Sequence, residues 1–232
     1  MGEHDNHRKR VYARFLREGL ADFEEHNALE FLLFLARARG DTNLLAHQLI
    51  ERFGSIAAVL DASEEELREV KGIGETAAVT LKFIPEMCAY YLDSKVNKKQ
   101  PLNSIEAVGA FFMPKFFGKT REAFFVAALD DRRRLLRCLC ISDGMANSTS
   151  VSTAKIVATA VRCHATGVIL AHNHPQGITL PSSNDIACTK AVYKALNTVN
   201  IELLDHFIFA DNEYLSFAQT NYMQSIHDSI QR

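Results

Sequence analysis

The sequence predicts a chain in two parts, an all-α N-terminal domain followed by an α/β sandwich with a mixed sheet. Up to about residue 93 the apolar residues recur at helical spacing, whereas after about residue 105 compact apolar runs alternate with amphipathic segments. Between these parts the segment SKVNKKQPLNS is polar, bears lysines and contains Pro101, as interdomain linkers often do. We therefore expect a helical domain over 1–93, a linker over 94–104 and a second domain over 105–232.

The composition is that of a soluble globular protein. Hydrophobic residues make up 47% of the 232 residues and charged residues 23%, which leaves enough apolar side chain for a core. No apolar run approaches the length of a membrane span, and the N-terminal segment MGEHDNHRKR is too polar for a signal peptide. We therefore expect a cytoplasmic protein that does not bind membranes. Its cysteines are odd in number, lack zinc-site spacing and are expected to be reduced: Cys88, Cys138, Cys140, Cys163 and Cys188.

The first part is expected to fold into several short helices. Helical spacing is clear in NALEFLLFLARA, NLLAHQLIERF and SIAAVL, and Ser63 with Glu66 forms a capping-box pattern. The later stretch LREVKGIGETAAVTLKFI resembles a helix-hairpin-helix, with Gly72 and Gly74 in the hairpin. Such a hairpin can offer backbone N–H groups to a phosphate, which makes DNA a conceivable partner of this domain.

Charge argues against DNA binding by the first part. Residues 1–100 hold 14 Lys and Arg against 17 Asp and Glu, a net charge of −3, and Glu75 follows the hairpin directly. Phosphate affinity depends on neutralising cations, so a basic surface is the usual sign of a DNA-binding domain. A scaffold or protein-interaction role for this domain is therefore an equally good interpretation.

In the second part, strands and helices are expected to alternate. Residues 123–130 and 135–142 are apolar runs around the polar turn DDRRR, a pattern typical of a β-hairpin. A helix with Ser152 as its N-cap follows. The remaining expected elements are a buried strand over 167–172, a helix over 183–199, and two strands within IELLDHFIFA and EYLSF.

The chemistry concentrates in HNHPQGITLPSSND, residues 172–185. His172 and His174 are two apart, so at the end of a strand both imidazoles project to one side. The Pro/Gly turn can bring the chain back, so that Asp185, at the start of the next helix, adds a carboxylate oxygen. Two imidazoles and one carboxylate suit Zn²⁺ and leave a fourth tetrahedral position open, as in catalytic zinc sites.

Three other interpretations compete with a zinc site. Ser182 and Asp185 also fit a helix N-terminus, where Ser182 caps the helix and Asp185 faces the positive end of the dipole. The letters of His172, Asn173 and His174 spell the name of a nuclease motif whose residues are scattered rather than adjacent, so that match is typographic. A zinc deaminase would need a His-x-Glu and a Pro-Cys-x-x-Cys, and the sequence contains neither.

The pattern His172-x-His174, Ser182 and Asp185 resembles the JAMM motif of the JAB/MPN metallopeptidases. The flanking HNHPQG, PSSND and LLDHFIF are similar to the RadC branch of that family, whose members also carry an N-terminal helix-hairpin-helix, so that the similarity covers nearly the whole chain. The resemblance implies a domain laid out like cytidine deaminases. It also implies hydrolysis of a peptide or isopeptide bond in a peptide or protein substrate.

Carried over to this chain, the resemblance implies Zn²⁺ ligands at His172, His174 and Asp185, and a Ser182 that stabilises an oxyanion. The family's catalytic glutamate precedes the first strand of the domain, and in TREAFFVAALD that residue is Glu122. From the residues alone, Glu122 is one of several candidate carboxylates, with Asp130, Asp131 and Asp143. Asp205 and His206 are more typical of strand residues or of residues that hydrogen-bond to ligands.

Two departures bear on the substrate. Asn173 stands between the histidines, as in RadC-like proteins, where the branch that cleaves ubiquitin isopeptides has Ser or Thr. Residues 152–155 (STAK) replace the Pro-Arg-Glu run that RadC-like chains usually show. An alternative function stays open on the same sequence: a DNA-associated repair or recombination accessory protein that works through the hairpin, with the metal centre secondary.

Overall fold

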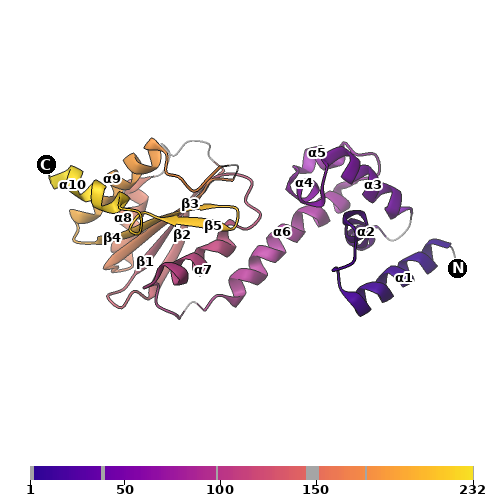
Figure 1. Cartoon of the computed structure of the whole chain (residues 1–232), viewed down its shortest axis with the longest axis horizontal. Helices are drawn as coiled ribbons and strands as arrows, with labels where there is room; N and C mark the ends of the chain where they lie inside the picture. Colours follow the sequence, from indigo (N-terminus) through magenta and orange to yellow (C-terminus); the bar gives the residue numbers. More distant parts are fainter. Residues whose placement is uncertain (1–2, 38–39, 98, 145–151, 176, 232) are drawn as a thin grey trace. The chain divides into compact units, whose positions relative to one another are not determined.

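The computed structural model describes residues 3–37, 40–97, 99–144, 152–175 and 177–231 (Figure 1). The chain divides into two compact units, residues 1–88 and 89–232. Within the described ranges, no helix is both long and apolar enough to cross a membrane.

The first unit is helical, as the sequence predicts. Its helices are α1 (Glu3–Glu18), α2 (Glu25–Ala36), α3 (Thr42–Phe53), α4 (Ile56–Asp61), α5 (Glu64–Arg68) and α6 (Glu75–Lys95), the last of which continues past residue 88. Apolar side chains from α2 to α6 form one core, including Leu33, Leu49 and Leu81, all fully buried. The predicted capping box forms at α5, where Ser63 and Glu66 bond to each other's backbone N–H groups.

A glycine turn joins α5 to α6. Gly72 has a φ of 103°, a conformation that favours glycine, and its carbonyl accepts a hydrogen bond of 3.1 Å from Nη1 of Arg37. A helix, a glycine turn and a second helix therefore follow one another here. Assignment of this region to the helix-hairpin-helix class stays a prediction, as do the domain boundaries at 93 and 105.

The second unit contains a mixed five-stranded sheet in the order β2-β1-β3-β4-β5. The strands are β1 (Ala123–Leu129), β2 (Leu135–Asp143), β3 (Gly167–Asn173), β4 (Glu202–Ala210) and β5 (Glu213–Ser216). Only β3 and β4 run parallel, because α9 (Ser183–Asn197) connects them as a crossover; the other neighbours are antiparallel. The predicted hairpin and the strand before the histidines are thus confirmed.

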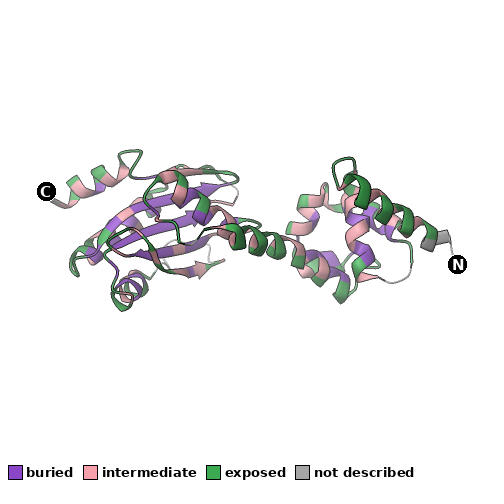
Figure 2. Cartoon of the chain, turned by 90° about the horizontal axis from the view of Figure 1, so that it is seen from below, coloured by how far each residue is buried: buried purple, intermediate pink, exposed green. Residues whose placement is uncertain are grey.

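Helices cover both faces of this sheet, which makes the sandwich (Figures 1 and 2). On one face α7 (Ile105–Phe116) packs Phe111 and Phe112 against β1, β3 and β4. On the other face α8 (Thr153–Arg162) and α9 pack Ile156 and Val192 against the alternate side chains of β1 and β3. Burial of β3 on both faces explains why residues 167–171 are apolar throughout rather than alternating.

Two helices have no counterpart in the sequence prediction. α7 reads IEAVGAFFMPKF, in which only Glu106 and Lys115 are charged, so it lacks the polar face that marks an amphipathic helix. α10 (Tyr222–Gln231) closes the chain and contributes Ile226 to a small cluster with Phe217. The helix capped by Ser152 is present as predicted, with the Ser152 hydroxyl accepting from Lys155 N.

Candidate metal centre

Two histidines stand at the carboxyl end of β3. His172 is the penultimate residue of the strand, and His174 follows its end, where its N–H still bonds to the carbonyl of Phe209 at 2.7 Å. This bond keeps the chain extended, so the two imidazoles project to the same side of the sheet, as the spacing predicts. The parallel strands β3 and β4 end at the same edge of the sheet, where ligand sites of α/β folds commonly lie.

Asp185 reaches the histidines from the first turn of α9. Ser182 is the N-cap of this helix, and its hydroxyl accepts from Asp185 N at 3.2 Å while Asp185 Oδ2 accepts from Ser182 N at 2.8 Å. The Ser182 hydroxyl also donates to Asp185 Oδ2 at 2.6 Å. The helix-cap interpretation of these two residues is therefore correct, and the cap fixes the direction in which the Asp185 carboxylate points.

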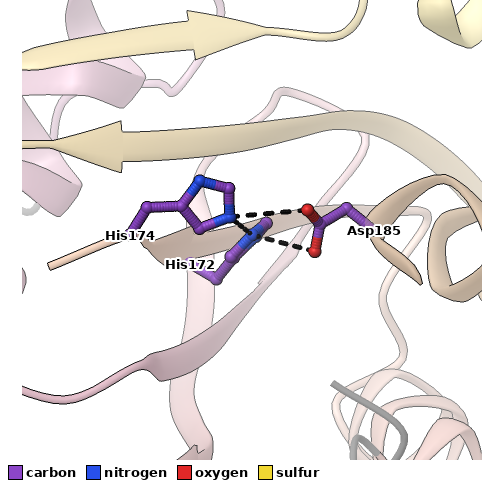
Figure 3. Close-up of side chains that lie close together, drawn as sticks. All are labelled: His172, His174 and Asp185. Carbon is purple, nitrogen blue, oxygen red and sulfur yellow. Dashed lines mark hydrogen bonds and ion pairs between the residues drawn. The ribbon is translucent and has the colours of Figure 1, made fainter. Parts of the chain in front are cut away.

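The three side chains converge on one point (Figure 3). Nε2 of His172 lies 3.0 Å from Nε2 of His174 and 3.1 Å from Oδ1 of Asp185. Nε2 of His174 lies 3.4 Å from Oδ2 of Asp185. Zinc at about 2.0 to 2.1 Å from each ligand requires ligand atoms about 3.3 Å apart in a tetrahedron, so these spacings fit. The side chains of His172 and Asp185 are 5% and 6% exposed and that of His174 is 16%, so solvent reaches the centre past His174.

Hydrogen bonds behind the centre decide which nitrogen of His172 carries a proton. The Thr189 hydroxyl donates to the carbonyl of Asp185 at 2.6 Å, so its oxygen can only accept from Nδ1 of His206, also at 2.6 Å. Burial lowers the pKa of His206 well below its ordinary value, so this ring is neutral and its Nε2 is an acceptor. Nδ1 of His172, 2.8 Å away, must therefore be the donor, which leaves Nε2 of His172 with a free lone pair.

In His174, too, the hydrogen-bond partner determines which ring nitrogen carries the proton. Its Nδ1 lies 2.8 Å from the carbonyl of Ile178, and a carbonyl only accepts, so Nδ1 holds the proton. In the neutral protein both Nε2 lone pairs then point toward each other and toward the Asp185 carboxylate. Three acceptors without a proton between them repel, and either a proton on Nε2 of His174, shared with Asp185, or a bound cation removes that repulsion. The donor set therefore fits a metal ion.

The pKa values of the metal-free cluster follow the same geometry. Burial alone raises the pKa of Asp185, but hydrogen bonds from His172, His174 and Ser182 outweigh it and hold this pKa far below its ordinary range. The pKa of His174 is raised, chiefly by its hydrogen bond to Asp185 and further by Ile178 O, although its burial acts in the opposite direction. Asp185 is thus an anion at any physiological pH, as a metal ligand has to be.

Glu122 lies directly before β1, at the same end of the sheet. Its half-buried carboxylate is among the charges that raise the pKa of His174, and Phe124, two residues later, lies opposite His172 in the register of β1 with β3. Its carbonyl accepts from Gly144 N at 2.9 Å, next to the end of β2. No metal-binding group found in the described part of the chain includes Glu122, which is consistent with a role other than ligand.

Three other carboxylates that the sequence offered have structural partners. Asp130 accepts from the backbone N–H groups of Arg132 and Arg134 and pairs with the Arg134 side chain, so it shapes the hairpin at the far end of β1. Asp143 pairs with Lys119 at 2.8 Å. Asp205 is buried and accepts from Ser216 Oγ, His206 N and Ala218 N. The sequence did not indicate Thr189 as part of the site. It also did not predict that His206 hydrogen-bonds to His172.

A family model described as RadC-like JAB domain matches residues 102–222 of the chain. The match begins before α7 and includes the whole sheet together with Glu122, Asn173 and every residue of the cluster described above.

Proposed function

The chain belongs to the RadC-like JAB domain family, and from this premise we propose that it is a zinc-dependent hydrolase of the JAMM type. In this proposal His172, His174 and Asp185 bind Zn²⁺, and the protein is a metallopeptidase that cleaves a peptide or isopeptide bond of a peptide or protein in the cytoplasm. The observation that carries the proposal is the convergence of three side chains: the Nε2 atoms of His172 and His174 lie 3.0 Å apart, and each lies 3.1 or 3.4 Å from an oxygen of Asp185. Both imidazole protons are directed away from this point.

Zinc, when bound, supplies Lewis acidity that polarises an amide carbonyl and acidifies water. The chain's own groups are proposed to manage the protons. Glu122 takes a proton from the attacking water and passes it to the leaving nitrogen, which needs a carboxylate that does not bind the metal. The register that sets Phe124, two residues after Glu122, opposite His172 supports this role, as does the contribution of the Glu122 charge to the raised pKa of His174.

Ser182 is proposed to donate a hydrogen bond to the oxyanion of the tetrahedral intermediate. A hydroxyl has one proton, and in the structure that proton is directed at Asp185 Oδ2. The proposed role therefore requires the Ser182 hydroxyl to turn from Asp185 to the substrate. Asp185 Oδ2 keeps the bond from Ser182 N at 2.8 Å when it does so, so the carboxylate does not lose its orientation.

The proposal is tested by loading the purified protein with zinc and incubating it with a mixed pool of synthetic peptides, with new amino groups as the readout. Zinc affinity is measured in parallel by competition with a chelating dye. We expect Asp185→Asn to lose both zinc and hydrolysis, and Glu122→Gln to keep zinc and lose hydrolysis. Asp143→Asn, a change to a carboxylate paired with Lys119, is the matched control and keeps both. Undiminished hydrolysis by metal-free protein contradicts the proposal.

A second candidate function is DNA association through the first unit. The observation that favours it is Arg37, whose guanidinium bonds to Gly72 O and so adds a second cation to the glycine turn, beside Lys71. The acidic side chains of α5 and Glu75 oppose it. We expect gel shifts of a short duplex with the full chain at physiological salt to decide it: retardation that Arg37→Gln reduces supports DNA association, and no retardation excludes it.

A further inference from the structure

Asn173, the residue between the two histidines, makes contacts that neither histidine makes. Successive side chains of a strand alternate between its faces, so Asn173 projects away from the metal centre. Its carboxamide oxygen accepts from Ala123 N at 2.7 Å, and its Nδ2 donates to the carbonyl of Arg121 at 3.2 Å. The side chain is buried, with the residue 4% exposed, so both bonds are shielded from water.

These two bonds hold the two peptide groups on either side of Glu122. The carbonyl of Arg121 belongs to the peptide before the Glu122 Cα, and the N–H of Ala123 belongs to the peptide after it. Fixing both peptide planes fixes φ and ψ of Glu122, and with them the direction of its Cα–Cβ bond.

The side chain does this where the regular ladder stops. Backbone pairing of β1 with β3 ends at Phe124 and His172, one residue short of Ala123 and Asn173. The carboxamide, which has one acceptor and donor hydrogens like a peptide group, continues the ladder beyond that point. On the opposite side, Gly144 N bonds to Glu122 O at 2.9 Å. The backbone of Glu122 is thus held from both neighbouring strands.

We propose that Asn173 is a positioning residue that fixes the Glu122 carboxylate relative to the metal ligands. The inference rests on the proposed function, in which Glu122 transfers protons at the metal centre. Glu122 lies 50 residues before His172, so no local bond sets its distance from the ligands. Asn173 supplies that link because it is bonded covalently to both ligand histidines and by hydrogen bonds to both peptides of Glu122.

The first test measures the link without any hydrolysis. Amide hydrogen exchange is followed in the zinc-loaded full chain for wild type, Asn173→Ala and Asn173→Asp. We expect faster exchange at residues 121–123 in Asn173→Ala and an intermediate rate in Asn173→Asp, because a carboxylate can accept from Ala123 N but cannot donate to Arg121 O. Zinc affinity stays within about threefold of wild type in both variants. Unchanged exchange at 121–123, or loss of zinc, overturns the inference.

The second test measures coupling between Asn173 and Glu122. The peptide of the pool that wild type cleaves fastest is resynthesised and used for Asn173→Ala, Glu122→Gln and the double variant. We expect Asn173→Ala to lower kcat about 10- to 100-fold with little change in KM, because a small misplacement of a reacting group has effects of this size. In the Glu122→Gln background the same change has no further effect. Asn43→Ala, which removes a bond to Glu30 in the first unit, is the control and leaves kcat unchanged.

The outcomes separate the inference from the function on which it rests. If Glu122→Gln keeps full activity, the proposed role of Glu122 fails first. If Glu122→Gln is inactive and Asn173→Ala is as active as wild type, or slows both backgrounds by the same factor, only the inference fails. If Asn173→Ala does not fold, as circular dichroism would reveal, the isosteric Asn173→Asp carries both tests. We then expect a kcat between those of wild type and Glu122→Gln.

Discussion

The two units of the chain differ in what they bury. The first unit has a core of aliphatic side chains, and among the described residues only Glu30 and Thr42 are polar and buried there. The second unit buries a larger set of polar residues, most of them at or behind one end of its sheet: Thr159, His172, Asn173, Asp185, Thr189, Asp205, His206 and Ser216.

This difference distinguishes the unit that contains the candidate metal centre from the unit that does not. Burial of a polar group costs free energy unless it is hydrogen-bonded, and among the described residues no buried side-chain nitrogen or oxygen lacks a partner. In the first unit the core alone accounts for the fold. In the second unit Thr189 bonds to His206, which bonds to the candidate ligand His172, and Asn173 bonds to the peptide groups on either side of Glu122. The buried polar network of this unit is therefore gathered around the candidate metal centre.

The largest effect on kcat is expected from the capping box, a motif that both units contain. Both have a capping box, with Ser63 at α5 and Ser182 at α9. Replacing either serine by alanine should lower the free energy of unfolding by about 1 kcal/mol, as the loss of an N-cap does. Only Ser182→Ala should also lower kcat, by about 10²- to 10³-fold, the typical loss when one oxyanion donor is removed. Equal kcat in the two variants would assign Ser182 to capping alone.

The next effect is expected behind the ligands. His206→Gln removes the acceptor that fixes the proton on Nδ1 of His172, so zinc affinity should fall about 10- to 100-fold, as for other outer partners of metal ligands. Thr189→Val should give a smaller loss, because it removes only the oxygen that orients His206. His227→Gln, on α10, is the control and should leave dye-competition affinities unchanged. If His206→Gln bound zinc with wild-type affinity, the hydrogen bond to His206 would not be needed to keep the proton on Nδ1 of His172.

A smaller effect on stability and on zinc affinity is expected from a change in pH. The pKa of His174 is raised above its ordinary value of 6.5, chiefly by its bond to Asp185, so this pair stabilises the metal-free protein fully below pH 6.5. The contribution is lost as the pH rises through the raised pKa. Zinc must displace the same proton, so its apparent affinity should rise about tenfold per pH unit below that pKa and level off above it.

Thermal melts of metal-free protein and zinc titrations over the same pH range check these opposite trends. Asp185→Asn should flatten the pH dependence of the metal-free melting temperature, since it removes the main cause of the shift. A melting temperature that rises through the same range in wild type would contradict the assignment of the proton to this pair.

The smallest effect on the metal centre should come from the first unit. Leu49 is fully buried in its core, and Leu49→Ala should destabilise that unit by about 2 to 5 kcal/mol. Zinc affinity of the full chain should stay at the wild-type value below the melting transition. A parallel loss of zinc would show that the two units are energetically coupled.

Local patterns predicted much of this molecule. The strand before the histidines, the hairpin around Asp130, the cap at Ser182 and the metal-binding set of His172, His174 and Asp185 all follow from residues within about one turn or one strand of each other. They were predictable because period-two spacing, capping and turn chemistry are properties of short segments. α7 was not predicted because its run is apolar on nearly every side, with only Glu106 and Lys115 charged, and so lacks the polar face by which a helix is recognised.

The sequence by itself therefore determined the two-part organisation and the residues of the candidate metal-binding cluster. Only the tertiary structure determined which residues hydrogen-bond to this cluster and to the backbone around Glu122. The pairing of β3 with β4 sets Leu170 opposite His206 and so brings His206 to His172, 34 residues away. The end of the β1–β3 ladder brings Asn173 to the backbone of Glu122, across 50 residues. Strand register sets both contacts, and register depends on the packing of the whole sheet rather than on any local pattern.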